Sequence, residues 1–117
     1  MLRTQIHLRL MAMGSTPPIR CEIRAELLPA TEKGLQVLAN TAAVRAELRR
    51  AGGLNPVARL IDSERCLEVT YEVEASDAEE VAQRAEEVIR DTAAAFWGDS
   101  ITWRINDIGI APPWKFP

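Results

Sequence analysis

The stretch Ile19-Arg20-Cys21-Glu22-Ile23-Arg24-Ala25-Glu26-Leu27 decides the fold class of this chain. Every odd position in it is small or apolar, and every even position is charged. Because side chains alternate between the two faces of a strand, this pattern predicts a β-strand with one face in a core and the other in water. A second stretch from Leu67 to Ala75 has the same alternation, again with the small or apolar residues at odd positions. We therefore expect two half-buried strands that share one core.

A helix is predicted between these two strands. Thr31 is a suitable helix cap, and the apolar periodicity indicates an unbroken helix from there to Arg50 or Ala51. Gly52 and Gly53 follow as a stop signal. The apolar arc of this helix is unusually wide, because Val37, Val44 and Leu48 extend it around the helix. The sequence leaves open whether the chain's own ends or another subunit cover this arc.

A second helix follows the strand that ends at Ala75. Ser76 and Glu79 have the spacing of a capping box, and Gly98 is the expected end of this helix. Its apolar residues form one stripe at helical spacing: Ala78, Val81, Ala82, Ala85, Val88, Ile89, Thr92, Ala93 and Phe96.

Two further strands complete the pattern, at Val57–Ile61 and at Ile101–Ile105. The order strand, helix, strand, strand, helix, strand predicts a two-layer α+β sandwich, because one face of each element must be buried. The pattern resembles the ferredoxin-like arrangement, whose split β-α-β connections imply an antiparallel sheet in the order 4-1-3-2. This resemblance is one of fold pattern over residues 19–108. It implies no particular activity, since the fold hosts many functions.

Two ends flank the predicted domain of residues 19–108. Residues 1–18 form an arm in which Ile6–Leu10 alternates, so the arm is either an extra edge strand or a loosely held extension. Residues 109–117 form a proline-rich tail that carries Trp114 and Phe116. Such aromatic side chains are costly to leave in water, and we expect them to pack on the domain or on a partner.

Composition limits the location of the protein. The 117 residues are 47% hydrophobic and 26% charged, as in globular proteins, and no apolar run approaches the ~20 residues that cross a bilayer. We expect no membrane association and no secretory signal. Cys21 and Cys66 fall on opposite faces of their predicted strands and therefore should not pair. Unpaired thiols favour a cytoplasmic location.

The residues for catalysis are scarce. His7 is the single histidine and lies on the arm, and no glycine-rich phosphate loop or zinc-binding spacing is present. We therefore expect no catalytic residue, no cofactor and no metal site, and a protein that is not an enzyme. The carboxylate pairs of the second helix lie where solvation explains them.

The face of the predicted sheet turned away from the helices is highly charged. Arg20, Arg24 and Arg104 on this open face are weak candidates for contacting an anion or small ligand. Glutamates on neighbouring strands can pair with them, which is the simpler interpretation. Aromatic residues for stacking bases are missing, so no nucleic-acid partner is expected. The open face comprises Arg20, Glu22, Arg24, Glu26, Glu68, Thr70, Glu72, Glu74, Thr102, Arg104 and Asn106.

Together these patterns favour a non-catalytic module that acts through protein–protein association, either as a homo-oligomer or as an accessory subunit. An alternative is a regulatory domain that holds a small ligand at a subunit interface, and a third is a dimeric α+β barrel enzyme. The predicted partner is the chain itself or another protein. The candidate interface residues are Val37, Val44, Leu48, Trp97, Trp114 and Phe116.

Overall fold

A computed structural model describes residues 18–97 and 100–110 of the chain. The elements in chain order are β1 (Ile19–Pro29), α2 (Glu32–Leu38), α3 (Thr41–Arg50), β2 (Leu54–Ile61), the 3-10 helix η1 (Asp62–Glu64), β3 (Cys66–Ala75), α4 (Ala78–Trp97) and β4 (Ile101–Ile110). Residues 1–17 of the predicted arm and residues 111–117 of the predicted tail, with the alternating segment and the aromatic residues, lie outside the described residues.

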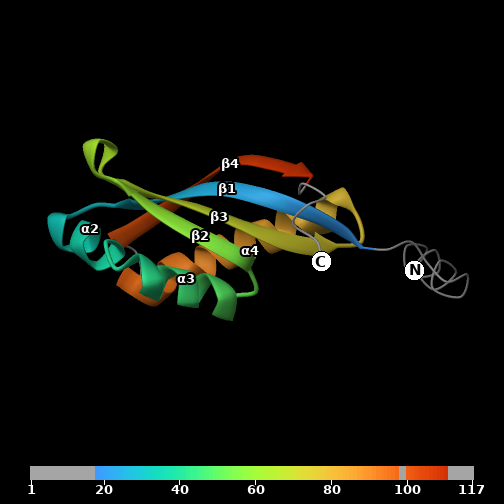
Figure 1. The fold of residues 1–117 in the computed structure, drawn as a ribbon, viewed down its shortest axis with the longest axis horizontal. Coiled ribbons are helices and arrows are strands. Elements are labelled where there is room, and N and C mark those ends of the chain that lie inside the picture. Colours follow the sequence, from blue (N-terminus) through green and yellow to red (C-terminus); the bar gives the residue numbers. More distant parts are fainter. Residues whose placement is uncertain (1–17, 98–99, 111–117) are drawn as a thin grey trace, which may run out of the picture.

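The strands form one antiparallel sheet in the order β2-β3-β1-β4. The helices lie together against one side of this sheet, as Figure 1 shows. This arrangement confirms the predicted two-layer α+β sandwich with the ferredoxin-like strand order. Of the helices in the described part of the chain, none is both long and apolar enough to cross a membrane.

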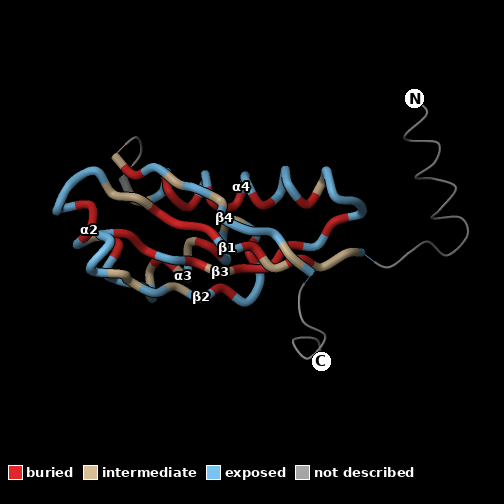
Figure 2. Tube along the Cα trace, turned by 90° about the horizontal axis from the view of Figure 1, so that it is seen from above, coloured by how far each residue is buried: buried red, intermediate tan, exposed pale blue. Residues whose placement is uncertain are grey.

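The core lies between the sheet and the helices, and the central strand β1 contributes the residues that the alternation predicted (Figure 2). Ile23 pairs with Tyr71 of β3 and Leu27 pairs with Leu67, and all four are completely buried. Burying side chains of this size contributes about 1.5–3 kcal/mol each. The period-2 pattern of the first and third strands therefore determines the sheet register.

The first predicted helix is in fact two helices, which corrects the expectation of an unbroken one. Thr31 caps α2 as predicted, because its side chain accepts a hydrogen bond from the backbone N–H of Gly34 at 3.0 Å. The helix then ends at Ala39, and the side chain of Asn40 caps α3 by accepting from the N–H of Ala43 at 3.2 Å. Asparagine is a strong cap because its side chain competes for backbone groups, and this favours a new start over continuation.

The cap of α4 is shifted by one residue from its predicted position. The carboxylate of Asp77 accepts from the backbone N–H of Glu80 at 2.8 Å, and the carboxylate of Glu80 accepts from the N–H of Ser76 at 2.7 Å. Asp77 is as good a cap as Ser76, and Glu80 lies three residues beyond it. The Ser76 N–H and the neighbouring Arg84 lower the pKa of Glu80.

Strand β4 is longer than predicted. It continues past Ile105 to Ile110, so Gly109 and Ile110 belong to the strand although the sequence placed them in the tail. Asn106 is the extra residue of a β-bulge, where the register between β1 and β4 shifts. Because a bulge reverses the alternation of inward and outward positions, the predicted strand appeared to end there.

Candidate functional site

The candidate interface on the first predicted helix has to be corrected. Val44 and Leu48 are completely buried in the core of the domain itself, and Val37 is partly buried. Asn40 begins a separate helix, α3, whose buried residues are Val44 and Leu48. Ala42, by contrast, is exposed. The wide apolar arc therefore belongs to two separate helices, and Val44 and Leu48 offer no free surface.

The three aromatic candidates have no described side chains. Trp97 is the last residue of α4, but its side chain is not among the described ones. Trp114 and Phe116 lie outside the described residues altogether. None of these three predictions is therefore tested by the fold.

An apolar surface does occur on β4, which the sequence reasoning missed. Ile108 is 40% exposed and Ile110 is 76% exposed. Both point to the helix side of the sheet, because they lie opposite Ile23 and Cys21 of β1. Strand β4 is also an edge of the sheet within the described part of the chain. We call the unpaired side of this strand, with Ile108 and Ile110, the β4 edge.

The sequence contained a signal for the β4 edge. Isoleucine or tryptophan occupies the odd positions up to Ile105, whereas isoleucine occupies the even positions 108 and 110. A change of parity within an otherwise apolar alternation indicates a bulge. Reading the strand through that change would have extended it to Ile110.

The arginines of the open face are matched by carboxylates rather than gathered in one place. Arg20 forms an ion pair with Glu74 at 2.5 Å, near one end of β1. Arg104 forms an ion pair with Glu26, six residues further along β1, or about 20 Å away in an extended strand. Arg24 contacts Glu22 of its own strand at 3.8 Å. Such an arrangement is poorly suited to an anion, because each positive charge already has a negative neighbour.

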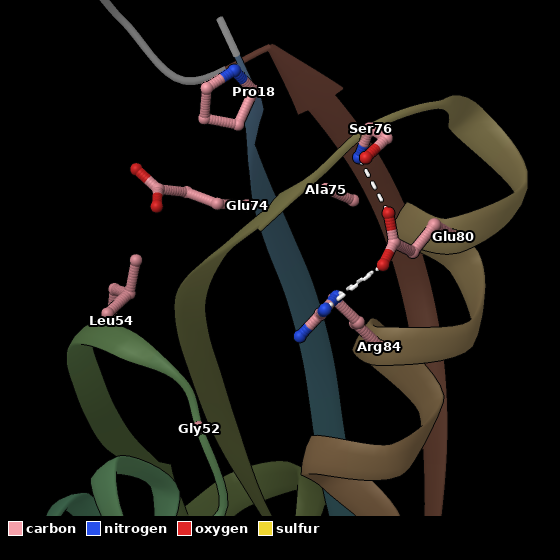
Figure 3. A pocket seen from close by; sticks show the side chains of 8 residues that line it. All are labelled: Pro18, Gly52, Leu54, Glu74, Ala75, Ser76, Glu80 and Arg84. Atoms are coloured by element: carbon pink, nitrogen blue, oxygen red, sulfur yellow. Dashed lines mark hydrogen bonds and ion pairs between the residues drawn. The ribbon is translucent and has the colours of Figure 1, made fainter. Parts of the chain in front are cut away.

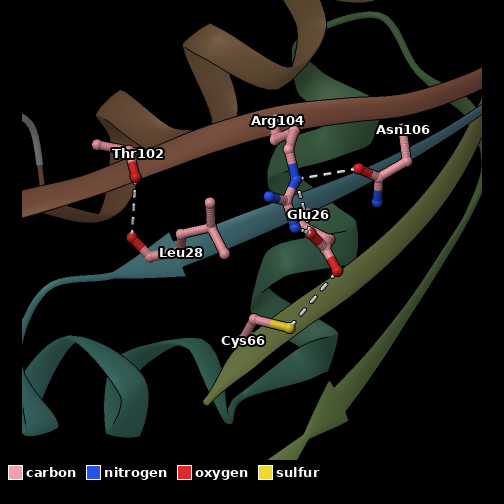
Figure 4. A network of polar contacts seen from close by, with 6 residues as sticks. All are labelled: Glu26, Leu28, Cys66, Thr102, Arg104 and Asn106. Carbon is pink, nitrogen blue, oxygen red and sulfur yellow. Dashed lines mark hydrogen bonds and ion pairs between the residues drawn. The ribbon is translucent and has the colours of Figure 1, made fainter. Parts of the chain in front are cut away.

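Glu26 is the centre of a small polar network on the open face (Figure 4). The guanidinium of Arg104 donates to Glu26 and, at 3.1 Å, to the side-chain oxygen of Asn106. Glu26 is 7% exposed, and the hydrogen bond from Arg104 lowers its pKa although burial opposes this shift. The bulge contributes Asn106 to the network, so it connects the sheet edge to the open face.

Cys66 lies on the other side of Glu26. Its thiol contacts the carboxylate of Glu26 at 3.8 Å, and burial followed by the charge of Glu26 raises the pKa of this thiol. Ligand atoms of Glu26, Glu64 and Cys66 fall within 4.8 Å of one another. Arg104, however, supplies the positive charge that a cation would bring to Glu26.

Cys21 faces the helices, and both cysteines are unpaired, as predicted.

A separate hollow of 410 Å³ opens between the start of β2, the end of β3 and the first turns of α4 (Figure 3). Leu54 and Glu74 line one side of it, and Glu80 and Arg84 line the other. Arg84 and Glu80 are joined by an ion pair of 3.0 Å. The hollow therefore combines an apolar wall with charges of both signs, and nothing in the sequence patterns pointed to it.

Comparison with known proteins gives no functional assignment. No protein-family model matches the chain, and no curated protein is significantly similar to it.

Proposed function

We propose that this protein is a small association module that binds another protein chain through the β4 edge. The observation that carries the proposal is the exposure of Ile108 and Ile110 on a ten-residue strand whose outer side has no neighbouring strand in the described part of the chain. The unpaired N–H and C=O groups of an edge strand are a template for a further strand. Burying an isoleucine side chain adds about 1.5–3 kcal/mol.

The opposite edge of the sheet is less suited to this role. Strand β2 contains Pro56, which has no N–H to donate to a further strand. Asn55, just before it, has a positive φ of 49°, so the backbone there departs from an extended conformation. These are devices that protect an edge from pairing. We therefore assign the association to β4 and not to β2.

A charge placed on the β4 edge tests the proposal. In I110K a lysine on the exposed edge should abolish self-association or the binding of an accessory partner, because edge lysines oppose strand pairing. The matched control is V57K, since Val57 is 57% exposed on the other edge. Sedimentation and light scattering of the full chain measure its mass, and circular dichroism checks that both variants fold. An I110K variant with unchanged mass and partner binding would contradict the proposal.

A second candidate function, a regulatory ligand-binding domain, is favoured by the hollow at Leu54 and Arg84. A carboxylate, a guanidinium and an apolar wall around one space suit a small zwitterion such as an amino acid, whose own charges would replace the ion pair between Glu80 and Arg84. A thermal-shift screen with free amino acids tests this, because a ligand raises stability by mass action. Stabilisation that is lost in both L54A and R84Q would support it, and no shift at millimolar ligand would exclude it.

We also propose that the module has no catalysis of its own and works in the cytoplasm. The two unpaired, buried cysteines support a reducing location. Among the described residues that line the hollow there is no cysteine or histidine, the side chains that most often act as nucleophile or base. Mass spectrometry of the protein purified under non-reducing conditions tests the location, since a disulfide would argue against it.

A further inference from the structure

The pattern of side chains along β4 identifies the kind of chain that fits its edge. We infer that the partner is a second copy of this chain, which pairs β4 antiparallel with β4 around a two-fold axis next to Asn106. This inference rests on the proposed function and specifies its partner. The two sheets would then form one continuous sheet with the helices of both copies on the same side.

The bulge allows this pairing because the residues that face the helices are at odd positions before it and at even positions after it. In an antiparallel pair, directly opposite residues must point to the same face. Before the bulge Trp103 faces the helices, and after it Ile108 does. Centring the two-fold axis on the bulge therefore places Trp103 opposite Ile108 of the second copy, and Ile101 opposite Ile110. The exposed isoleucines thus gain apolar partners on both sides of the axis.

Charge complementarity selects the same register. On the open face, Arg104 would lie opposite Asp107 of the second copy, and the symmetry repeats this pair. The side chain of Arg104 is 61% exposed even with its ion pair to Glu26, so most of it remains accessible to a further charged group. Among the residues that the structure describes, Asp107 makes no ion pair. Each Asp107 would therefore gain a cation from the second copy.

Other registers lose both advantages. A shift of one residue places inward-facing residues opposite outward-facing ones. A shift of two residues leaves strand ends unpaired and places Arg104 opposite Gly109 or Ile105 instead of Asp107. The register centred on the bulge is thus the one that pairs Ile101–Arg104 with Asp107–Ile110 of the second copy, with matching faces and opposite charges. Ile105 and Asn106 lie at the axis itself, where the bulge interrupts the alternation.

Engineered cysteines test the register directly. Thr102 would lie opposite Gly109 of the second copy, and a Cβ at position 109 meets no atom of the described residues within 4 Å. Mild oxidation of full-length T102C/G109C should therefore give a covalent dimer, whereas T102C alone, G109C alone and the register-shifted control T102C/D107C should stay largely monomeric. The native cysteines are buried and should contribute little background. Non-reducing gels and intact mass measure the product.

A charge exchange provides an independent test. D107R and R104D each place like charges opposite one another and should weaken self-association about tenfold. An equimolar mixture of D107R and R104D should restore the association. In the mixed dimer the two arginines of one chain lie opposite the two aspartates of the other. As a control, R59D carries the same charge change as R104D but on β2, where Arg59 pairs with Glu68. Its β4 strand is unchanged, so it should self-associate like the wild type.

The outcomes separate this inference from the proposed function. A wild-type chain that sediments as a monomer at all concentrations would overturn the second copy as partner, while loss of another partner's binding in I110K would still support β4 association. A dimer in which T102C/D107C cross-links instead of T102C/G109C would overturn the register. A dimer that is unaffected by I110K would overturn both.

Discussion

The hydroxyl of Tyr71 donates a hydrogen bond to the backbone carbonyl of Ala85, with the two oxygen atoms 2.6 Å apart. Both residues are completely buried, so this bond joins β3 to the middle of α4 inside the core. Burial raises the pKa of the Tyr71 phenol, which therefore stays a neutral donor at ordinary pH. A polar group that is buried in this way has to be satisfied, and here it sets the position of the helix on the sheet.

Removal of this hydroxyl should destabilise the fold. Y71F keeps the ring in the core but loses the bond, and we expect the free energy of unfolding to fall by about 1 kcal/mol. Urea denaturation measures the change. V57T is a control for a small polar change at an exposed site and should stay within about 0.5 kcal/mol of wild type. Equal stability of Y71F and wild type would mean that helix packing alone positions α4.

The ion pair between Glu26 and Arg104 should make stability depend on acid. Because Arg104 lowers the pKa of Glu26 in the folded state, the ionised carboxylate stabilises the fold above its unfolded pKa. This contribution is lost as the pH falls through the folded pKa, below the usual range of a glutamate. E26Q should cost about 1 kcal/mol at pH 7, and the difference from wild type should shrink in acid.

Denaturation of E26Q and wild type at several pH values provides the measurement. The matched control is E68Q, because Glu68 forms an exposed pair with Arg59 on the same face. Exposed pairs contribute little, so E68Q should change stability by less than about 0.5 kcal/mol at any pH. A constant difference between E26Q and wild type down to strong acid would contradict the assignment.

The cap at Asn40 should be required for the two-helix arrangement. N40A removes the acceptor for the N–H of Ala43 and should cost about 1 kcal/mol. N40D keeps an oxygen in the same place and should stay within a few tenths of a kcal/mol of wild type. Thermal unfolding compares the three proteins. If N40A were as stable as N40D, the break would have another cause.

Gly53 marks a close approach between the loop before β2 and the core. A Cβ at this position would lie 3.1 Å from the carbonyl oxygen of Leu48 and 3.2 Å from the Cβ of Tyr71. G53A should therefore cost about 1–3 kcal/mol through overpacking. G109A is the control, since a Cβ at this position meets no atom within 4 Å in the part of the chain that the structure describes, and should be nearly neutral for folding. Urea midpoints of the two variants measure this difference.

Local alternation was enough to predict the sheet. In β1 and β3 every second residue is small or apolar, and the observed register pairs these positions across the two strands, as Ile23 with Tyr71 shows. Parity also placed Cys21 and Cys66 on opposite faces. The same reasoning predicted glutamate–arginine pairs on the open face, and Arg20 with Glu74 confirms it. These outcomes depend on neighbouring positions along a strand, which a sequence displays directly.

The candidate interface could not be predicted as well. Whether Val44 and Leu48 face a partner or the core depends on the separate helix that begins after Asn40. A periodicity count could not show this, because it assumes one continuous helix. Likewise, the exposure of Ile108 and Ile110 depends on how the helix layer covers the edge strand β4, which no local pattern displays. A helix cap or a β-bulge depends on a single residue and contributes little free energy locally. Tertiary packing therefore decides whether the helix or strand is interrupted there.

The sequence by itself thus determined the sandwich, the strand order and the charge of the open face, because the period of hydrophobicity dictates which side of each element is buried. Only the tertiary structure decided which apolar residues remain outside. Two of the predicted interface residues, Val44 and Leu48, complete the core, while Ile108 and Ile110 extend past it. The physical reason is that the exposure of a side chain depends on how the sheet and helices pack together and on where the neighbouring elements begin and end. No single segment of sequence specifies this.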